Sequence, residues 1–187
     1  MVSMHLLWLP IVVSAVIVFA LSAIIHMMLP YHRNDFSKLP SEDAVMDALR
    51  PFNIAPGDYM VPCAGNPESM RTPEFSAKMA KGPVVIMTAI KPGPPNMGAN
   101  LVQWFIYCVV VGVFVAYVSG RALPHGASYL HVFRFAGVTA FIAYSVAMWQ
   151  DSIWYKRKWS TTLKSNFDGL LYALVTAGFF GWLWPRT

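Results

Sequence analysis

Charged residues are scarce in this chain of 187 residues, with 14 Lys or Arg and nine Asp or Glu. At 12% charged, the chain has about half the share that is usual in a soluble domain, while 56% of it is hydrophobic. This composition excludes a disordered chain and a nucleic-acid-binding arm, and it argues against an ordinary cytosolic enzyme. We expect an integral membrane protein whose partners are membrane lipids and other membrane proteins, with no nucleic acid.

Cysteine and catalytic motifs are also lacking. The two cysteines, Cys63 and Cys108, are too few for a zinc or iron–sulfur framework. They fall in a long loop and in an apolar run, so we expect no disulfide between them. The sequence has no Gly-x-Ser-x-Gly nucleophile motif, no His-Glu-x-x-His zinc motif and no phosphate loop. No enzyme class is therefore indicated by a motif.

Four long apolar runs are the main feature that is present. Each is close to the roughly 20 residues that a helix needs to cross a bilayer core. The runs cover residues 6–29, 101–119, 129–149 and 167–184. All seven tryptophans fall at or just beyond the end of a run, at the headgroup level that Trp prefers: Trp8, Trp104, Trp149, Trp154, Trp159, Trp182 and Trp184. We predict an all-α integral membrane protein, a four-transmembrane-helix bundle, with the first run as an uncleaved anchor.

Lys and Arg are unevenly divided between the two faces that four spans define. Eight lie near the span ends on the face of the first and third loops, and three lie on the other face: Arg33, Lys38, Lys81, Lys91, Lys156, Arg157, Lys158 and Lys164 against Arg121, Arg134 and Arg186. Basic loops stay in the cytoplasm. We therefore expect a bacterial inner-membrane protein with the long loop 30–100 in the cytoplasm and both termini outside.

Small residues repeat every four positions along three of the runs. Such a series lies on one side of a helix and lets two membrane helices approach closely. We predict that helix packing uses Gly112, Ala116, Gly120, Gly169, Ala173, Ala177 and Gly181, together with an alanine series in the third run. This packing serves either the bundle itself or a partner.

The long loop 30–100 holds eleven of the fourteen prolines but reads as a folded α+β cap. We predict two short helices and two short strands, at 41–49, 72–82, 58–61 and 84–90. Ser41 and Thr72 are placed to cap the two helices, and Gly82 to end the second. The two strands are expected to pair. Asn96 or Asn100 is expected to cap the second span.

Ionisable residues gather where the first, third and fourth spans reach the same face. His26, Tyr31 and His32 end the first span, Asp151 follows the third, and Asp168 begins the fourth. Two imidazoles and two carboxylates could bind a divalent metal ion or move a proton, and we name His26, His32 and Asp151 as the metal ligands, with Asp168 beside them. The opposing interpretation is purely structural, because the six-residue His spacing and the intervening proline keep both rings off one helical face.

Basic residues on both faces are expected to contact lipid or a partner protein. Arg134 lies one to two turns inside the third span, where its long side chain can reach the headgroups. His131 and His125 lie near it in sequence. On the other face we assign lipid or partner contact to Lys156, Arg157 and Lys158.

Other cofactors and transport are weakly indicated. His26 and His131 lie near opposite faces, so one chain cannot supply a pair of haem ligands. Copper is possible because the chain has eleven methionines, but these show no Met-x-x-Met clustering. Near the centres of the four predicted spans lie Tyr144 and aliphatic residues, so the middle of the membrane has no set of polar groups that could form a transport site. This argues against transport by a single chain.

We therefore expect a non-catalytic protein, either an accessory or assembly subunit of a larger membrane complex or a homo-oligomeric structural protein. One alternative is a small membrane-embedded metal or redox enzyme that uses His26, His32, Asp151 and Asp168. The other alternative is an oligomeric channel or transporter.

Overall fold

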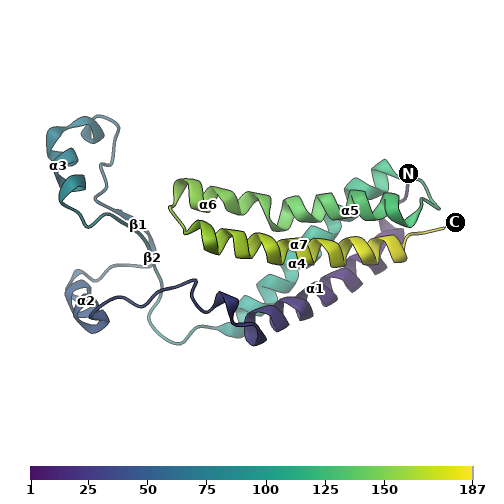
Figure 1. The fold of residues 1–187 in the computed structure, drawn as a ribbon, viewed down its shortest axis with the longest axis horizontal. Coiled ribbons are helices and arrows are strands. Elements are labelled where there is room, and N and C mark those ends of the chain that lie inside the picture. The colour runs from purple at the N-terminus through teal and green to yellow at the C-terminus, as the bar shows by residue number, and fades with distance from the viewer. Residues whose placement is uncertain (187) are drawn as a thin grey trace. The chain divides into compact units, whose positions relative to one another are not determined.

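The computed structural model describes residues 1–186, and its long helices form a bundle (Figure 1). The four long helices are α1 (Trp8–Met28), α4 (Met97–Ala122), α5 (Tyr129–Tyr144) and α7 (Trp159–Trp182). The chain divides into two compact units, one made of Met1–Phe36 with Asn96–Thr187 and the other of Ser37–Pro95. The bundle forms the first unit, and most of the predicted loop cap forms the second.

Three helical stretches are long and apolar enough to cross a membrane: Met4–Met28, Met97–Ala122 and Tyr129–Trp154. They correspond to the first three predicted runs. The fourth run belongs to α7, which begins at Trp159 rather than near residue 167 and carries Lys164 and Asp168 within it. These charges lower the mean hydropathy of α7, so length and composition do not mark it as a membrane span.

The third predicted run is interrupted rather than continuous. Regular helix α5 ends at Tyr144, and Ser145 leaves the helical conformation with φ −127° and ψ −52°. A 3₁₀ turn, Val146–Met148, and the short helix α6 (Trp149–Trp154) follow. A Cβ on Gly169 of α7 would lie 3.1 Å from the carbonyl oxygen of Tyr144, so α7 is in close contact with α5 where α5 ends.

Small residues lie at the contacts between helices. A Cβ on Gly112 would lie 3.2 Å from the Ile11 side chain, and one on Gly120 would lie 2.9 Å from the Val2 carbonyl oxygen. A Cβ on Gly181 would lie 2.7 Å from the Tyr129 ring. The alanines of the predicted series are buried: Ala116, Ala173 and Ala177. Close backbone approach within the chain therefore occupies these positions.

The second unit contains helices α2 (Glu42–Leu49) and α3 (Pro73–Lys81) and strands β1 (Gly57–Val61) and β2 (Val85–Ala89). The strands pair antiparallel, with Gly57 opposite Ala89 and Val61 opposite Val85. This confirms the predicted two helices and two paired strands. A two-stranded ribbon is marginally stable by itself, so α2, α3 and the many prolines must limit the freedom of this unit.

Two of the three predicted helix caps are confirmed and one is wrong. The Thr72 hydroxyl accepts a hydrogen bond from the Phe75 amide at 3.2 Å, and the Asn96 side chain accepts one from the Ala99 amide at 3.1 Å. Asn96 rather than Asn100 therefore caps α4. Ser41 does not cap α2, because its backbone is left-handed with φ 51° and its hydroxyl makes no capping bond. A cap needs an extended backbone to aim its oxygen at the first turn.

Candidate metal centre at the end of the bundle

The site begins where Pro30 stops helix α1. Leu29 has the extended backbone that a following proline favours, with φ −89° and ψ 135°. The chain then forms a 3₁₀ turn, Pro30–His32, which folds back on the end of α1. As a result the His26 and His32 rings stack, with centroids 4.7 Å apart and planes 8° from parallel. The six-residue spacing that seemed to separate the two histidines is overcome by this turn.

The buried carboxylate of Asp168 lies against the same turn. Asp168 belongs to α7 and is 3% exposed. Its Oδ1 accepts a hydrogen bond from the Tyr31 hydroxyl, and its Oδ2 lies 2.8 Å from His32 Nε2. A buried carboxylate is costly unless it has such partners, so this contact joins the end of α1 to α7 with high specificity.

A second carboxylate holds His32 from its other side. Asp35 Oδ2 lies 2.7 Å from His32 Nδ1, and Asp35 Oδ1 accepts a hydrogen bond from Lys164 Nζ at 2.9 Å. Burial by itself raises the pKa of Asp35, but the hydrogen bonds and charges of His32 and Lys164 outweigh it and hold the pKa below its usual range. Both His32 nitrogens face carboxylate oxygens, so the metal-free ring donates to both only when it is doubly protonated.

Tyr31 remains a hydrogen-bond donor to this network. Burial, the hydrogen bond to Asp168 and the negative charges of Asp168 and Asp35 all raise the pKa of the Tyr31 phenol above its usual value. The hydroxyl is therefore protonated across the physiological pH range. It fixes one oxygen of Asp168 and leaves the other directed toward His32.

Three residues offer atoms that could hold one metal ion. One ligand atom each of His26, His32 and Asp168 can be chosen so that all lie within 4.8 Å of one another. His26 Nδ1 lies 3.0 Å from the Ser22 carbonyl oxygen, which can only accept a hydrogen bond, so Nδ1 is the donor and Nε2 is the ring nitrogen that remains to hold an ion. His32 is oriented by Asp35, the carboxylate–histidine–metal arrangement that second-shell groups commonly supply.

The donor set fits a divalent transition metal. Two imidazoles and one carboxylate suit Zn²⁺ and its neighbours, and three protein ligands leave a further position open. Because the two rings are stacked, one of them must turn before both lone pairs can point at one ion. His26 is the exposed member of the group. Among residues 1–186 its ring makes one hydrogen bond, to the Ser22 carbonyl oxygen, which makes it the ring that can turn.

Asp151 lies outside this group. It belongs to α6, where its carboxylate is 3.8 Å from the Arg157 guanidinium and its carbonyl accepts a hydrogen bond from the Arg157 amide. The ligand group that the structure brings together contains Asp168 in its place. Asp151 thus helps to close the turn between α6 and α7.

Sequence reasoning missed Asp35 and Lys164 as parts of the site. Two local signals could have found them. Asp35 follows His32 by three residues, and Lys164 precedes Asp168 by four on a helix, which places both α7 side chains on one face. Neither spacing by itself indicates that the two pairs meet.

A polar aromatic cluster lies behind the site inside the bundle. The Tyr144 and Tyr172 ring centroids are 5.5 Å apart, and Trp104 lies 5.9 Å from Tyr172. Trp104 Nε1 donates a hydrogen bond to the Ser22 hydroxyl at 2.7 Å. The Tyr172 hydroxyl is buried and has no hydrogen-bond partner among residues 1–186. This cluster brings hydroxyl and indole groups together inside the bundle.

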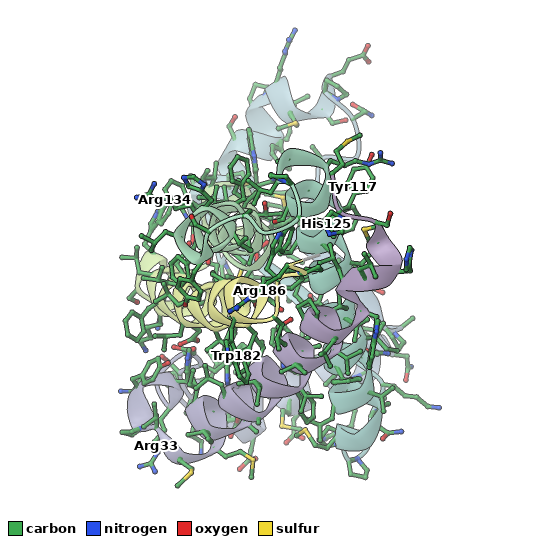
Figure 2. The ribbon with its side chains drawn as sticks, turned by 90° about the vertical axis from the view of Figure 1, so that its right-hand side faces the viewer. Arg33, Tyr117, His125, Arg134, Trp182 and Arg186 are labelled. Atoms are coloured by element: carbon green, nitrogen blue, oxygen red, sulfur yellow. The ribbon has the colours of Figure 1, made fainter. Side chains whose placement is uncertain are left out.

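The basic residues assigned to lipid or partner contact lie on the outside of the molecule. Arg134 and His131 are exposed on α5, and Figure 2 shows Arg134 at the periphery of the bundle. Lys156, Arg157 and Lys158 are exposed in the turn before α7.

The candidate metal-binding residues thus come from α1, from the turn that follows it and from α7. Comparison of the chain with protein-family models, with curated proteins and with solved structures finds no match.

Proposed function

We propose that this chain is an integral membrane protein that binds a divalent transition-metal ion through His26, His32 and Asp168. The observation that supports it most is the convergence of their ligand atoms within 4.8 Å, with Asp168 almost fully buried. Water or an external ligand would take the open coordination position.

The second shell favours a metal site over a purely structural polar cluster. Asp35 orients His32, Lys164 balances the charge of Asp35, and Tyr31 orients Asp168. Every ligand except His26 is thus positioned by a second residue, as in metal sites that hold their ligands ready.

The accessory or structural role expected from sequence loses one of its supports. Gly112, Gly120 and Gly181 contact helices of the same chain, so these positions are not free to bind a partner. Trp104, Tyr144 and Tyr172 pack into one aromatic cluster inside the bundle. We therefore place metal binding first and keep a subunit role as a compatible proposal.

We also propose four membrane crossings, because α7 runs antiparallel beside α5. Near one end Gly169 approaches Tyr144, in the middle a Cβ on Gly137 would lie 3.2 Å from Ala177, and near the other end Gly181 approaches Tyr129. If α5 crosses the bilayer, a helix that follows it for this distance crosses back. The excess of basic residues favours a bacterial inner membrane with residues 37–95 in the cytoplasm, and the metal site near that face.

The test is a titration of the chelator-treated, detergent-purified chain with Co²⁺, followed by its visible absorption and by competition with Zn²⁺. We expect one ion per chain. Asp168→Asn and His32→Ala should lose binding, and Asp35→Asn should weaken it by about 10- to 100-fold, as is usual for a second-shell residue.

Asp151→Asn is the matched control, since Asp151 is the other carboxylate near this end of the bundle and pairs with Arg157. It should bind like the unaltered chain. Equal loss in Asp151→Asn and Asp168→Asn, or undiminished binding in Asp168→Asn, would contradict the proposed site.

A further inference from the structure

Four sulfur-containing side chains line one cavity in the unit 37–95. The cavity has a volume of about 380 Å³ and is lined by Met60, Cys63, Met70 and Met79, together with proline, small residues, Asn66 and Phe75. Cys63 is a free, exposed cysteine. The feature lies outside the divalent metal site and in a different compact unit.

Local structure brings these sulfurs together from separate elements. Met60 lies on β1, Cys63 follows that strand, Met70 lies in the 3₁₀ turn Ser69–Arg71, and Met79 lies on α3. The Thr72 cap fixes where α3 begins, which places Met79 two turns along the helix. The spacings in sequence are irregular, so no Met-x-x-Met pattern reveals the cluster.

Two of the methionines that line the cavity are open to solvent. Met60 is 45% exposed and Met70 is 61% exposed. An ion from solution can therefore reach this side of the cavity.

The ligand chemistry selects a soft, monovalent ion. Thiolate and thioether sulfur prefer Cu(I), whereas Zn²⁺ prefers imidazole, several thiolates or carboxylate. Among the described residues that line the cavity there is no histidine and no carboxylate. One thiolate with neutral thioethers also balances the single charge of Cu(I).

We propose that this cavity binds one Cu(I) ion through the Cys63 thiolate and the thioethers of Met60, Met70 and Met79. On binding, the Cys63 S–H bond breaks, the proton passes to water and an S–Cu bond forms. Copper enters and remains as Cu(I), so no electron is transferred. The remaining lining is mainly apolar.

The experiment is an anaerobic competition between the full-length purified chain and a chromophoric Cu(I) chelator. We expect one Cu(I) per chain and a first coordination shell of several sulfur atoms in X-ray absorption. Cys63→Ser should abolish binding. The triple variant Met60→Leu, Met70→Leu, Met79→Leu keeps the side-chain volume and should weaken binding by about tenfold or more.

Met46→Leu is the matched control, because Met46 is an exposed methionine of the same unit that does not line this cavity. It should bind Cu(I) normally, and so should His26→Ala, which alters only the divalent site. Unchanged Cu(I) affinity in the triple variant would show that Cys63 binds the ion without the thioethers, and would overturn the proposal. Retained binding in Cys63→Ser, or nitrogen atoms in the first shell, would overturn it as well. Circular dichroism of each variant checks that the chain is folded.

Discussion

At the scale of single residues, the buried hydroxyl of Tyr172 contrasts with its neighbours. Tyr172 is 4% exposed, and its hydroxyl has no hydrogen-bond partner among residues 1–186. Tyr107, in the same aromatic cluster, donates its hydroxyl hydrogen to the Ala143 carbonyl at 2.7 Å. A buried polar group without a hydrogen-bond partner destabilises the folded state, whereas a hydrogen-bonded one stabilises it modestly.

Tyr172→Phe should therefore raise the unfolding free energy of the metal-free chain by about 1 kcal/mol, and Tyr107→Phe should lower it by about 0.5–1.5 kcal/mol. Both changes remove one oxygen and keep the ring, so packing is matched. Denaturant unfolding in detergent micelles would measure the difference. A loss of stability in Tyr172→Phe as large as that in Tyr107→Phe would show that the hydroxyl is satisfied in the folded protein.

At the scale of helices, close backbone approach is the main packing device. Lipid-immersed helices gain little from burying apolar surface, so contact distance decides how well they associate. At Gly120 the obstacle to a side chain is the carbonyl oxygen of Val2, which cannot rotate away as a side chain would. At Gly98, in the first turn of α4, a Cβ would meet only the Asn96 side chain, at 3.6 Å.

Gly120→Ala should destabilise the chain by about 1–3 kcal/mol, because the N-terminal segment must move away from α4. Gly98→Ala lies on the same helix and should stabilise it by about 0.5–1 kcal/mol, the ordinary preference of alanine over glycine in a helix. Thermal unfolding followed by circular dichroism compares the two. Equal effects of both changes would contradict the close contact at Gly120.

Sequence patterns predicted the presence of helices and strands better than the points where they begin, end or break. Thr72 followed by Pro73 marked the start of α3 correctly, because a cap and its helix are neighbours in sequence. Ser41 has the same chemistry but does not cap, because its backbone is left-handed. The break at Ser145 was not predicted either, since the run 129–149 contains no proline and only one charged residue, Arg134, and the break occurs where α7 approaches.

At the scale of the whole molecule, the crossing of α7 determines where the C-terminus lies. Four crossings return the C-terminus to the side of the N-terminus, whereas three leave it on the side of the turn that contains Arg157. The basic residues of that turn and of residues 37–95 then share one face.

Single-cysteine labelling in oriented vesicles should place Cys63 and Arg157→Cys on one side and His125→Cys on the other. Cys108 is replaced by Ser in each variant, and Cys63 is also replaced by Ser in the two variants with an introduced cysteine. A C-terminal tag should be accessible from the His125 side. A tag accessible from the Arg157 side would show that α7 does not cross, and Cys63 on the outer face would reverse the proposed orientation.

The sequence by itself determined the apolar runs, the short helices and strands of the loop cap and the residue types available for a metal site. These depend on composition, on local periodicity and on caps, which are properties of neighbours along the chain. Only the tertiary structure decided which of the two carboxylates meets the histidines. Asp151 and Asp168 looked equivalent in sequence, but the turn after Pro30 and the pairing of α1 with α7 bring His32 to Asp168. Such a choice depends on contacts between segments far apart in sequence, and local patterns carry no information about them.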